Sequence, residues 1–214
     1  MESIRYLIFV FIVTLFSMIL HELAHGLVAL WQGDQTAKLS GRLSLNPLRH
    51  IDPIMTIAVP LVLALMGGPI FGGAKPVPIN VRNLKHREWS FAMVAAAGPL
   101  TNFLLALIFF LFGHFSGALY GNGVLGDLCY VGVMTNLGFA VFNILPIPPL
   151  DGSRILYVFA PGAVQTLMKK MERYGTMFVF LFIFICGGLF SSYMWGAEKG
   201  ILNLFYWMVG GGNI

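Results

Sequence analysis

A long apolar segment at the N-terminus runs directly into a cluster of ionisable side chains. Residues 4–20 are dominated by Leu, Ile, Val and Phe, and the apolar pattern continues as far as Trp31. Inside this segment lies the sequence His21-Glu22-Leu-Ala-His25. An apolar stretch of about 20 residues or more is typical of a helix that spans a bilayer. The fold must therefore accommodate His21, Glu22 and His25 at membrane depth.

The two histidines stand four residues apart, which places both imidazoles on the same face of a helix. Two imidazoles at this spacing suit two positions of a tetrahedral zinc site, and Glu22 between them can accept a proton from the attacking water. On a soluble helix the same residues could be a chance pattern. In hydrocarbon, however, ionisable groups cost several kcal/mol unless they serve a polar, hydrated or metal-filled cavity. The surroundings therefore favour a metal site.

The composition excludes an ordinary soluble domain. Of the 214 residues, 57% are hydrophobic and 10% are charged, and the mean hydropathy is +0.81. We expect an all-α integral membrane protein, a polytopic helical bundle with about four to six membrane segments. It should form a single domain over residues 1–214, with its core over about 4–160 and C-terminal membrane segments over 174–210. The net charge of +4 lies in short loops, where it indicates topology and not nucleic-acid binding.

Four stretches are predicted to span the membrane: about 4–31, 91–112, 125–145 and 174–192. The short tail, 200–210, carries Tyr206 and Trp207, which favours an interfacial or re-entrant position. Loops 32–52, 73–90 and 152–173 contain several Lys and Arg residues, whereas 113–124 contains none. The positive-inside rule therefore places the first three loops in the cytoplasm.

The apolar stretch 53–72 is interrupted by three prolines and a Gly-Gly pair. Both of its flanks are predicted to be cytoplasmic, so a single crossing does not fit the loop charges. We predict a re-entrant hairpin that dips into the protein and returns, since irregular backbone at membrane depth must be buried or line a wet cavity. An ordinary span is the alternative.

A catalytic zinc site needs a third protein ligand, and the best candidate is Asp151. It ends the sequence Asn143-Ile-Leu-Pro-Ile-Pro-Pro-Leu-Asp151, whose prolines stop the preceding helix and leave Asp151 on a loop. Asp151 could instead only cap the helix that follows. The topology favours a ligand, because spans 4–31 and 125–145 both begin outside and end on the same side of the membrane.

These motifs resemble those of the site-2 proteases, which are intramembrane zinc metalloproteases. The sequence His-Glu-Leu-Ala-His-Gly is similar to the family's HExxH motif. Residues 143–152 resemble its second signature, an Asn followed by a Pro-containing stretch that ends in Leu-Asp-Gly. Residues 41–47, 73–78 and 97–102 are similar to further family segments, and the likeness covers roughly residues 15–160. The chain differs from larger members in having no inserted PDZ-like or CBS-like domain.

The resemblance implies the role of each motif residue. By it, His21, His25 and Asp151 are ligands of one Zn²⁺ per chain, and Glu22 is the general base. Asn143 would be the polar partner of the substrate backbone or of the developing oxyanion. The expected activity is that of a zinc metalloendopeptidase that cleaves transmembrane segments of single-span membrane proteins near the cytoplasmic side.

The expected partners are a transmembrane protein substrate and membrane lipid, with no nucleic acid. The expected location is the prokaryotic cell (inner) membrane, as a multi-pass protein. Two other classes stay open: a metal-binding membrane transporter and a non-catalytic scaffold that binds membrane helices. A transporter should show repeated halves or polar residues spread over several spans. This chain instead concentrates its polar residues in two motifs.

Three further expectations concern residues outside these motifs. Segments 36–46 and 73–81 alternate in polarity, and we expect short strand-like elements near the active site that could pair with an extended substrate; ordinary loops are the alternative. His50 lies beside basic residues and is expected in solvent or among lipid headgroups. Asn102 is expected to bridge helices rather than to act in catalysis.

Overall fold

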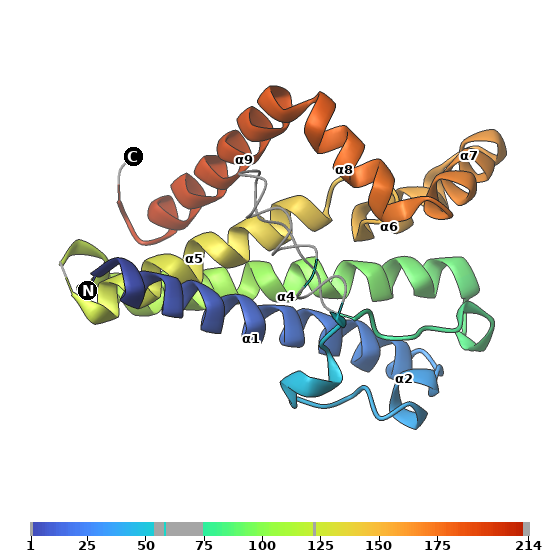
Figure 1. Cartoon of the computed structure of the whole chain (residues 1–214), viewed down its shortest axis with the longest axis horizontal. Helices are drawn as coiled ribbons and strands as arrows, with labels where there is room; N and C mark the ends of the chain where they lie inside the picture. The colour runs from blue at the N-terminus through green and yellow to red at the C-terminus, as the bar shows by residue number, and fades with distance from the viewer. Residues whose placement is uncertain (1, 54–57, 59–74, 122, 212–214) are drawn as a thin grey trace.

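Three long helices lie side by side and form the body of the molecule (Figure 1). The computed structural model describes residues 2–53, 58, 75–121 and 123–211. Helices α1 (Glu2–Trp31) and α5 (Val124–Asn143) run in the same direction, and α4 (Arg87–Phe115) packs against both in the opposite direction. All three are long and apolar enough to cross a membrane. The protein is therefore an all-helical integral membrane protein across the described residues, as the sequence predicts.

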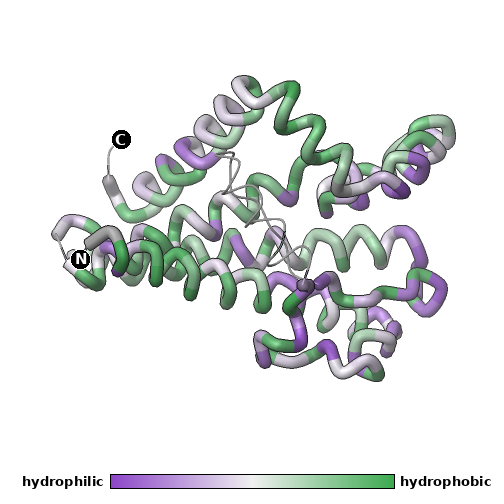
Figure 2. Tube along the Cα trace, in the orientation of Figure 1, coloured by the Kyte–Doolittle hydropathy of each residue, from purple (hydrophilic) through white to green (hydrophobic). Residues whose placement is uncertain are grey.

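The surfaces of these helices differ between the outer and inner sides. Figure 2 shows α1, α4 and α5 as largely hydrophobic along their length. On α1, Leu7 and Phe11 are 65% and 68% exposed, while Ile19 is fully buried. Continuous exposed apolar surface on a helix of this length is typical of contact with lipid. The inner sides of α4 and α5 pack into a core made of Ala106, Phe110, Val133 and Leu137, together with Phe205 near the C-terminus.

Helix α1 ends in a Schellman turn. Gly33 adopts a left-handed conformation with φ of +104°, which glycine reaches without steric cost. The Asp34 N–H donates to the Ala29 carbonyl at 2.9 Å, and the Gly33 N–H donates to the Leu30 carbonyl at 3.0 Å. These bonds satisfy carbonyls that the helix end would otherwise leave open, and they turn the chain sharply at the end of the first span.

The buried Asp34 carboxylate ties the end of α1 to a distant loop. It accepts hydrogen bonds from the Thr36 N–H at 3.0 Å, the Thr36 hydroxyl, the Asn80 N–H at 2.7 Å and the Asn83 amide at 3.0 Å. Burial raises the pKa of Asp34, but these donors outweigh it and hold the pKa below its usual value. The carboxylate therefore stays ionised and fixes the 75–83 segment beside α1.

Helix α5 ends at Asn143, and the chain then turns back through residues 144–150. Two short helices follow, α6 (Asp151–Phe159) and α7 (Gly162–Glu172). The first turn of α6 lies so close to the end of α5 that a Cβ at Gly152 would overlap the Ile144 carbonyl. The predicted break after residue 145 is confirmed, and only glycine fits at position 152.

The C-terminal third differs from the prediction. Helix α8 (Gly175–Ile185) and helix α9 (Gly187–Met208) meet at Cys186 with a bend of 93° (Figure 1). The predicted span 174–192 is therefore broken at Cys186, and the stretch 200–210 belongs to α9 instead of forming a separate element; its interfacial or re-entrant position stays a prediction. Hydropathy does not reveal a bend in an apolar run. Two glycines, Gly187 and Gly188, follow the corner, and Phe182 and Phe142 pack on Phe190 there.

The expected strand-like elements are not found in the described residues. Thr36–Leu39 forms a short helix, α2, so the expectation for that segment is wrong. Residues 75–80 have no regular secondary structure. They also have few donors for a ladder, because Pro76 and Pro78 lack an N–H and those of Lys75, Val77 and Asn80 are bonded within the protein.

The remaining short elements are 3-10 turns: η1 (Pro47–Arg49), η3 (Val81–Asn83) and η4 (Ala118–Tyr120). The predicted re-entrant hairpin over 53–72 lies almost wholly outside the described residues. Counted by length and composition, the described residues contain three candidate spans, or four if the bent α8–α9 pair is one.

Candidate metal centre

Three buried side chains meet where the end of α1 faces the start of α6. The Nε2 atoms of His21 and His25 are 3.0 Å apart, and Asp151 Oδ2 lies 3.2 Å from the first and 3.3 Å from the second. The three residues are only 8%, 6% and 6% exposed. The structure thus brings together the three residues that the sequence predicts as ligands.

Each imidazole is held by a contact to its other ring nitrogen. His25 Nδ1 lies 2.7 Å from the Val94 carbonyl, and His21 Nδ1 lies 2.5 Å from Asn102 Oδ1. A carbonyl can only accept, so His25 carries its proton on Nδ1 and presents a lone pair at Nε2. Metal-binding histidines are usually oriented by such a bond on the far side of the ring.

The donor set of this cluster fits a metal ion. Two imidazole nitrogens and a carboxylate oxygen converge, and acceptor atoms this close together repel one another unless a cation lies between them. Tetrahedral ligands at about 2.0–2.1 Å from a shared zinc stand roughly 3.3 Å apart. The observed separations of 3.0, 3.2 and 3.3 Å match that spacing. The residues therefore fit a three-ligand zinc site.

Gly98 on α4 allows the helix backbone to reach both histidines. A Cβ at this position would lie 2.5 Å from His21 Nε2 and 2.5 Å from His25 Nε2. No real side chain tolerates such contacts, so any residue other than glycine would displace the rings. Gly98 precedes Pro99, and both lie inside α4, the second candidate span of the bundle. In the sequence, only the family resemblance indicates a role for this segment.

Asp151 is the first residue of α6, and its side chain turns to the histidines instead of capping the helix. Arg154 approaches the other carboxylate oxygen, Oδ1, at 3.9 Å, and its guanidinium also lies 3.6 Å from Glu172. The Asp151 carboxylate can therefore serve as the third, anionic ligand beside the two imidazoles.

Glu22 and Asn143 lie outside the three-residue cluster. Glu22 Oε2 accepts a hydrogen bond from the Val77 N–H at 2.8 Å, which joins α1 to the 75–80 segment. Asn143 donates its amide to the Phe139 carbonyl of its own helix at 3.0 Å. Within the described residues, the Asn143 side chain has no hydrogen bond to His21, His25 or Asp151. The structure therefore brings Glu22, but not Asn143, into a new tertiary contact.

Two polar residues behave differently from the sequence-based expectation. His50 is 2% exposed, with Nε2 lying 2.7 Å from the Ser44 carbonyl, so its expected place in solvent is wrong. The loop folds back on itself, which its basic neighbours in sequence do not reveal. Asn102 does bridge helices, through a bond to Asn136, but it also contacts His21. Asn136 is absent from the residues predicted above, although a polar residue in the middle of an apolar span indicates a buried polar contact.

The sequence is similar to a known peptidase family and to several known proteins. The family model described as Peptidase family M50 matches residues 117–186. Two similar relatives carry the name "Putative zinc metalloprotease". YwhC of Bacillus subtilis (strain 168) is 40% identical, with 88% of this chain and 87% of the relative covered. Rip2 of Mycolicibacterium smegmatis is 28% identical, with 77% of this chain and 62% of the relative covered. No solved structure matches the chain.

Proposed function

This chain is a metalloprotease of peptidase family M50, the site-2 protease family, and from that premise we propose that it cleaves transmembrane segments of single-span membrane proteins. In this proposal His21, His25 and Asp151 hold one zinc ion. The observation that carries it is the convergence of two imidazole nitrogens and one carboxylate oxygen in a bundle of membrane-spanning helices. Hydrolytic chemistry at that place acts on peptide bonds that reach the lipid-embedded part of the bundle.

The metal ion and Glu22 have separate roles in the proposed hydrolysis. Zinc, when bound, acts as a Lewis acid that activates water and polarises the scissile carbonyl. Glu22 accepts the proton of the attacking water and returns it to the leaving amide nitrogen. The Val77 N–H holds Oε2 of Glu22 at 2.8 Å and leaves Oε1 as the oxygen that accepts the proton. The bond fixes the direction of the carboxylate and keeps it distinct from the ligand set.

Asn143 is proposed to donate to the developing oxyanion. Its amide is bonded to the Phe139 carbonyl in the structure, so this role requires the side chain to turn away from α5 when substrate enters. A helix end offers that freedom, because Asn143 is the last residue of α5 and the chain leaves helical geometry directly after it.

The substrate in this proposal is a membrane helix that unwinds locally. Carbonyls inside a helix are hydrogen-bonded and shielded by side chains, so the scissile bond must become extended before attack. Outward-facing apolar residues on α1 and α4, such as Phe11 and Ile108, give a transmembrane partner and lipid a matching surface. Charged residues on the same surfaces would disfavour such a partner.

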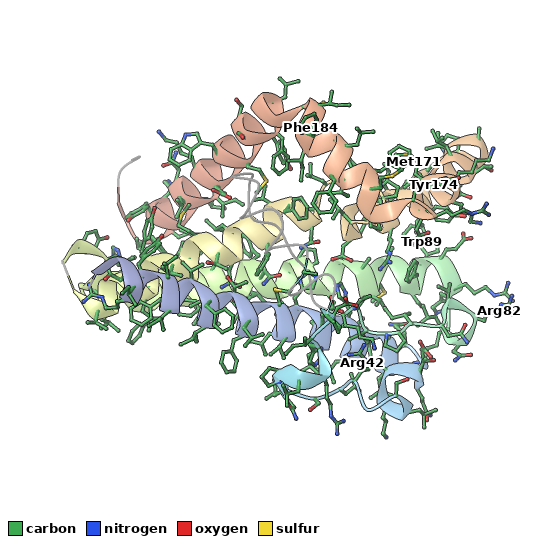
Figure 3. The ribbon with its side chains drawn as sticks, viewed as in Figure 1. Arg42, Arg82, Trp89, Met171, Tyr174 and Phe184 are labelled. Carbon is green, nitrogen blue, oxygen red and sulfur yellow. The ribbon has the colours of Figure 1, made fainter. Side chains whose placement is uncertain are left out.

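The metal ligands are proposed to lie near the cytoplasmic face of a prokaryotic inner membrane. Arg42, Arg82 and Trp89 lie in the half of the molecule that holds the C-terminal end of α1 and the start of α4 (Figure 3). At the other end, Arg5 forms an ion pair with Asp127 at 2.6 Å, so its charge is compensated there. The excess of Lys and Arg residues in loops 32–52, 73–90 and 152–173 supports this orientation.

Zinc content and cleavage, measured on the same purified samples, test the proposal. The protein is purified in detergent, its zinc per chain is measured, and it is incubated with a panel of single-span peptides. Glu22→Gln should retain zinc and abolish cleavage, because the amide cannot accept the proton. Asp151→Ala should lose both zinc and cleavage, because it removes the anionic ligand. Asp127→Asn, at the opposite end of the bundle, is the matched control and should keep both.

Two results would contradict the proposal. Undiminished zinc in the Asp151→Ala protein would move the third ligand elsewhere. A wild-type protein that binds zinc, cleaves no peptide of the panel and carries zinc across a liposome membrane would be a transporter.

A further inference from the structure

Two asparagines lie fully buried between the apolar helices of the bundle. Asn102 on α4 and Asn136 on α5 are both 0% exposed. An amide buried in an apolar medium costs free energy unless its groups are hydrogen-bonded. Asn102 donates to Asn136 Oδ1 at 3.0 Å, and Asn136 donates to the Gly132 carbonyl at 2.9 Å. The remaining oxygen, Asn102 Oδ1, lies 2.5 Å from His21 Nδ1.

The direction of this chain of bonds follows from its far end. The Gly132 carbonyl can only accept, so Asn136 must turn its NH₂ towards it and its oxygen towards Asn102. That oxygen can only accept in turn, so Asn102 must present its own NH₂ there and its oxygen to His21. The proton between Asn102 and His21 must then come from the histidine. This assignment does not depend on which amide atom was named oxygen or nitrogen.

The direction of these hydrogen bonds determines which ring nitrogen of His21 can bind a metal. With the proton on Nδ1, neutral His21 has its lone pair on Nε2, the atom that faces His25 and Asp151. His25 has the same tautomer, because its Nδ1–H donates directly to the Val94 carbonyl. His21 lacks a backbone carbonyl in that position and depends on two side chains instead.

We propose that Asn136 and Asn102 form a relay that sets the tautomer of His21 and so makes its Nε2 available to a metal. This inference rests on the proposed function for the ligand role of His21. Asn136 is a positioning residue, because it acts on His21 only through Asn102. Without Asn136, the Asn102 amide is free to turn over and donate its NH₂ to His21 Nδ1. The ring proton then moves to Nε2, and a protonated Nε2 is no ligand.

Asn136→Leu removes the acceptor at similar size and is the first test. In metal-free protein at alkaline pH, where imidazoles are neutral, ¹⁵N NMR of labelled histidines should show the His21 proton shifting from Nδ1 towards Nε2. Zinc affinity, measured by competition with a chelator, should fall about 10- to 100-fold, as for the loss of other outer contacts to metal ligands. The matched control is Ser90→Ala, which removes another buried side-chain hydrogen bond of α4, the one from Ser90 to Gln32 just after α1, and should change neither readout.

A rescue separates the relay from simple structural support. A carboxylate can only accept from His21, so Asn102→Asp no longer needs Asn136 to fix its direction. In the Asn136→Leu background, Asn102→Asp should therefore restore the Nδ1–H tautomer and most of the zinc affinity. If the two asparagines only bridged helices, this double variant would bind zinc no better than Asn136→Leu alone.

Three outcomes overturn the relay: an unchanged His21 tautomer in Asn136→Leu, an unchanged zinc affinity, or a double variant without rescue. Thermal unfolding identifies an Asn136→Leu protein that does not fold, and the smaller Asn136→Ala change, which also removes the acceptor, then carries the same NMR and zinc measurements. The NMR readout on metal-free wild-type protein is independent of hydrolysis. Failure of the proposed function would appear instead as wild-type protein without zinc or without cleavage.

Discussion

Gly98→Ala introduces the smallest side chain into the closest approach of α4 to the two histidines. The new Cβ would lie 2.5 Å from Nε2 of both His21 and His25, whereas ordinary van der Waals contact begins at 3.4 Å. The rings or the helix must therefore move by about 0.9 Å, and metal–ligand distances vary by only about 0.2 Å. The methyl group also fills space on the side of the atoms that bind the ion. We expect the ligand set to be lost although no ligand is changed.

Zinc affinity of the purified protein, measured by competition with a chelator of known affinity, should fall by at least about 100-fold, the upper end for loss of an outer contact. Overpacking should also lower the free energy of unfolding by about 1–3 kcal/mol, measured by thermal unfolding in detergent. Cleavage of single-span peptides should be lost with the metal.

The control for this variant is Gly138→Ala on α5, where the nearest atom to a new Cβ is Glu198 Oε1 at 3.6 Å, an ordinary contact. It adds the same methyl group to another membrane-spanning helix and should leave zinc affinity unchanged. A Gly98→Ala protein that binds zinc as tightly as wild type would refute the reasoning. It would mean that the rings can accommodate a methyl group at position 98 without leaving their metal-binding positions.

Two further variants test the supports of the site. In Gly152→Ala the Cβ would overlap the Ile144 carbonyl, so the turn between α5 and α6 should open, move Asp151 away from the histidines and lower the zinc content per chain; normal zinc content would contradict this. Asp34→Asn removes the oxygen that accepts from the Asn80 N–H and should cost about 1–3 kcal/mol of unfolding free energy at neutral pH. Because the folded protein holds the pKa of Asp34 below its unfolded value, the wild-type advantage exists above the unfolded pKa and is lost as pH falls through the folded pKa. Thermal unfolding of both proteins over an acidic pH series should therefore converge, and a gap that persists at the lowest pH would contradict the assignment.

The membrane helices and the metal ligands could be predicted from sequence because each depends on local pattern. The apolar length of 4–31 specifies a spanning helix, and the four-residue spacing of His21 and His25 specifies one face of it. Prolines after Asn143 end the span 125–145 and place Asp151 after a turn. Parallel directions of the spans then bring the two motifs to the same end of the bundle.

Other features depend on packing between distant segments and have little local signature. The 93° corner at Cys186 lies within a run of apolar residues, so hydropathy alone predicts one straight span there. His50 lies among basic residues in sequence yet is buried by the fold of its loop. The 75–80 segment alternates in polarity like a strand, but its N–H groups are bonded to Glu22, His50 and Asp34.

The sequence by itself determined which side chains can bind a metal, because ligand chemistry and helical spacing are properties of the residues. Only the tertiary structure decided how those side chains are held. The Gly98 backbone sets how close α4 comes, and Asn102 and Asn136 orient His21 from two other helices. Such contacts arise when helices distant in sequence pack at a fixed separation, and no pattern within one helix encodes that separation.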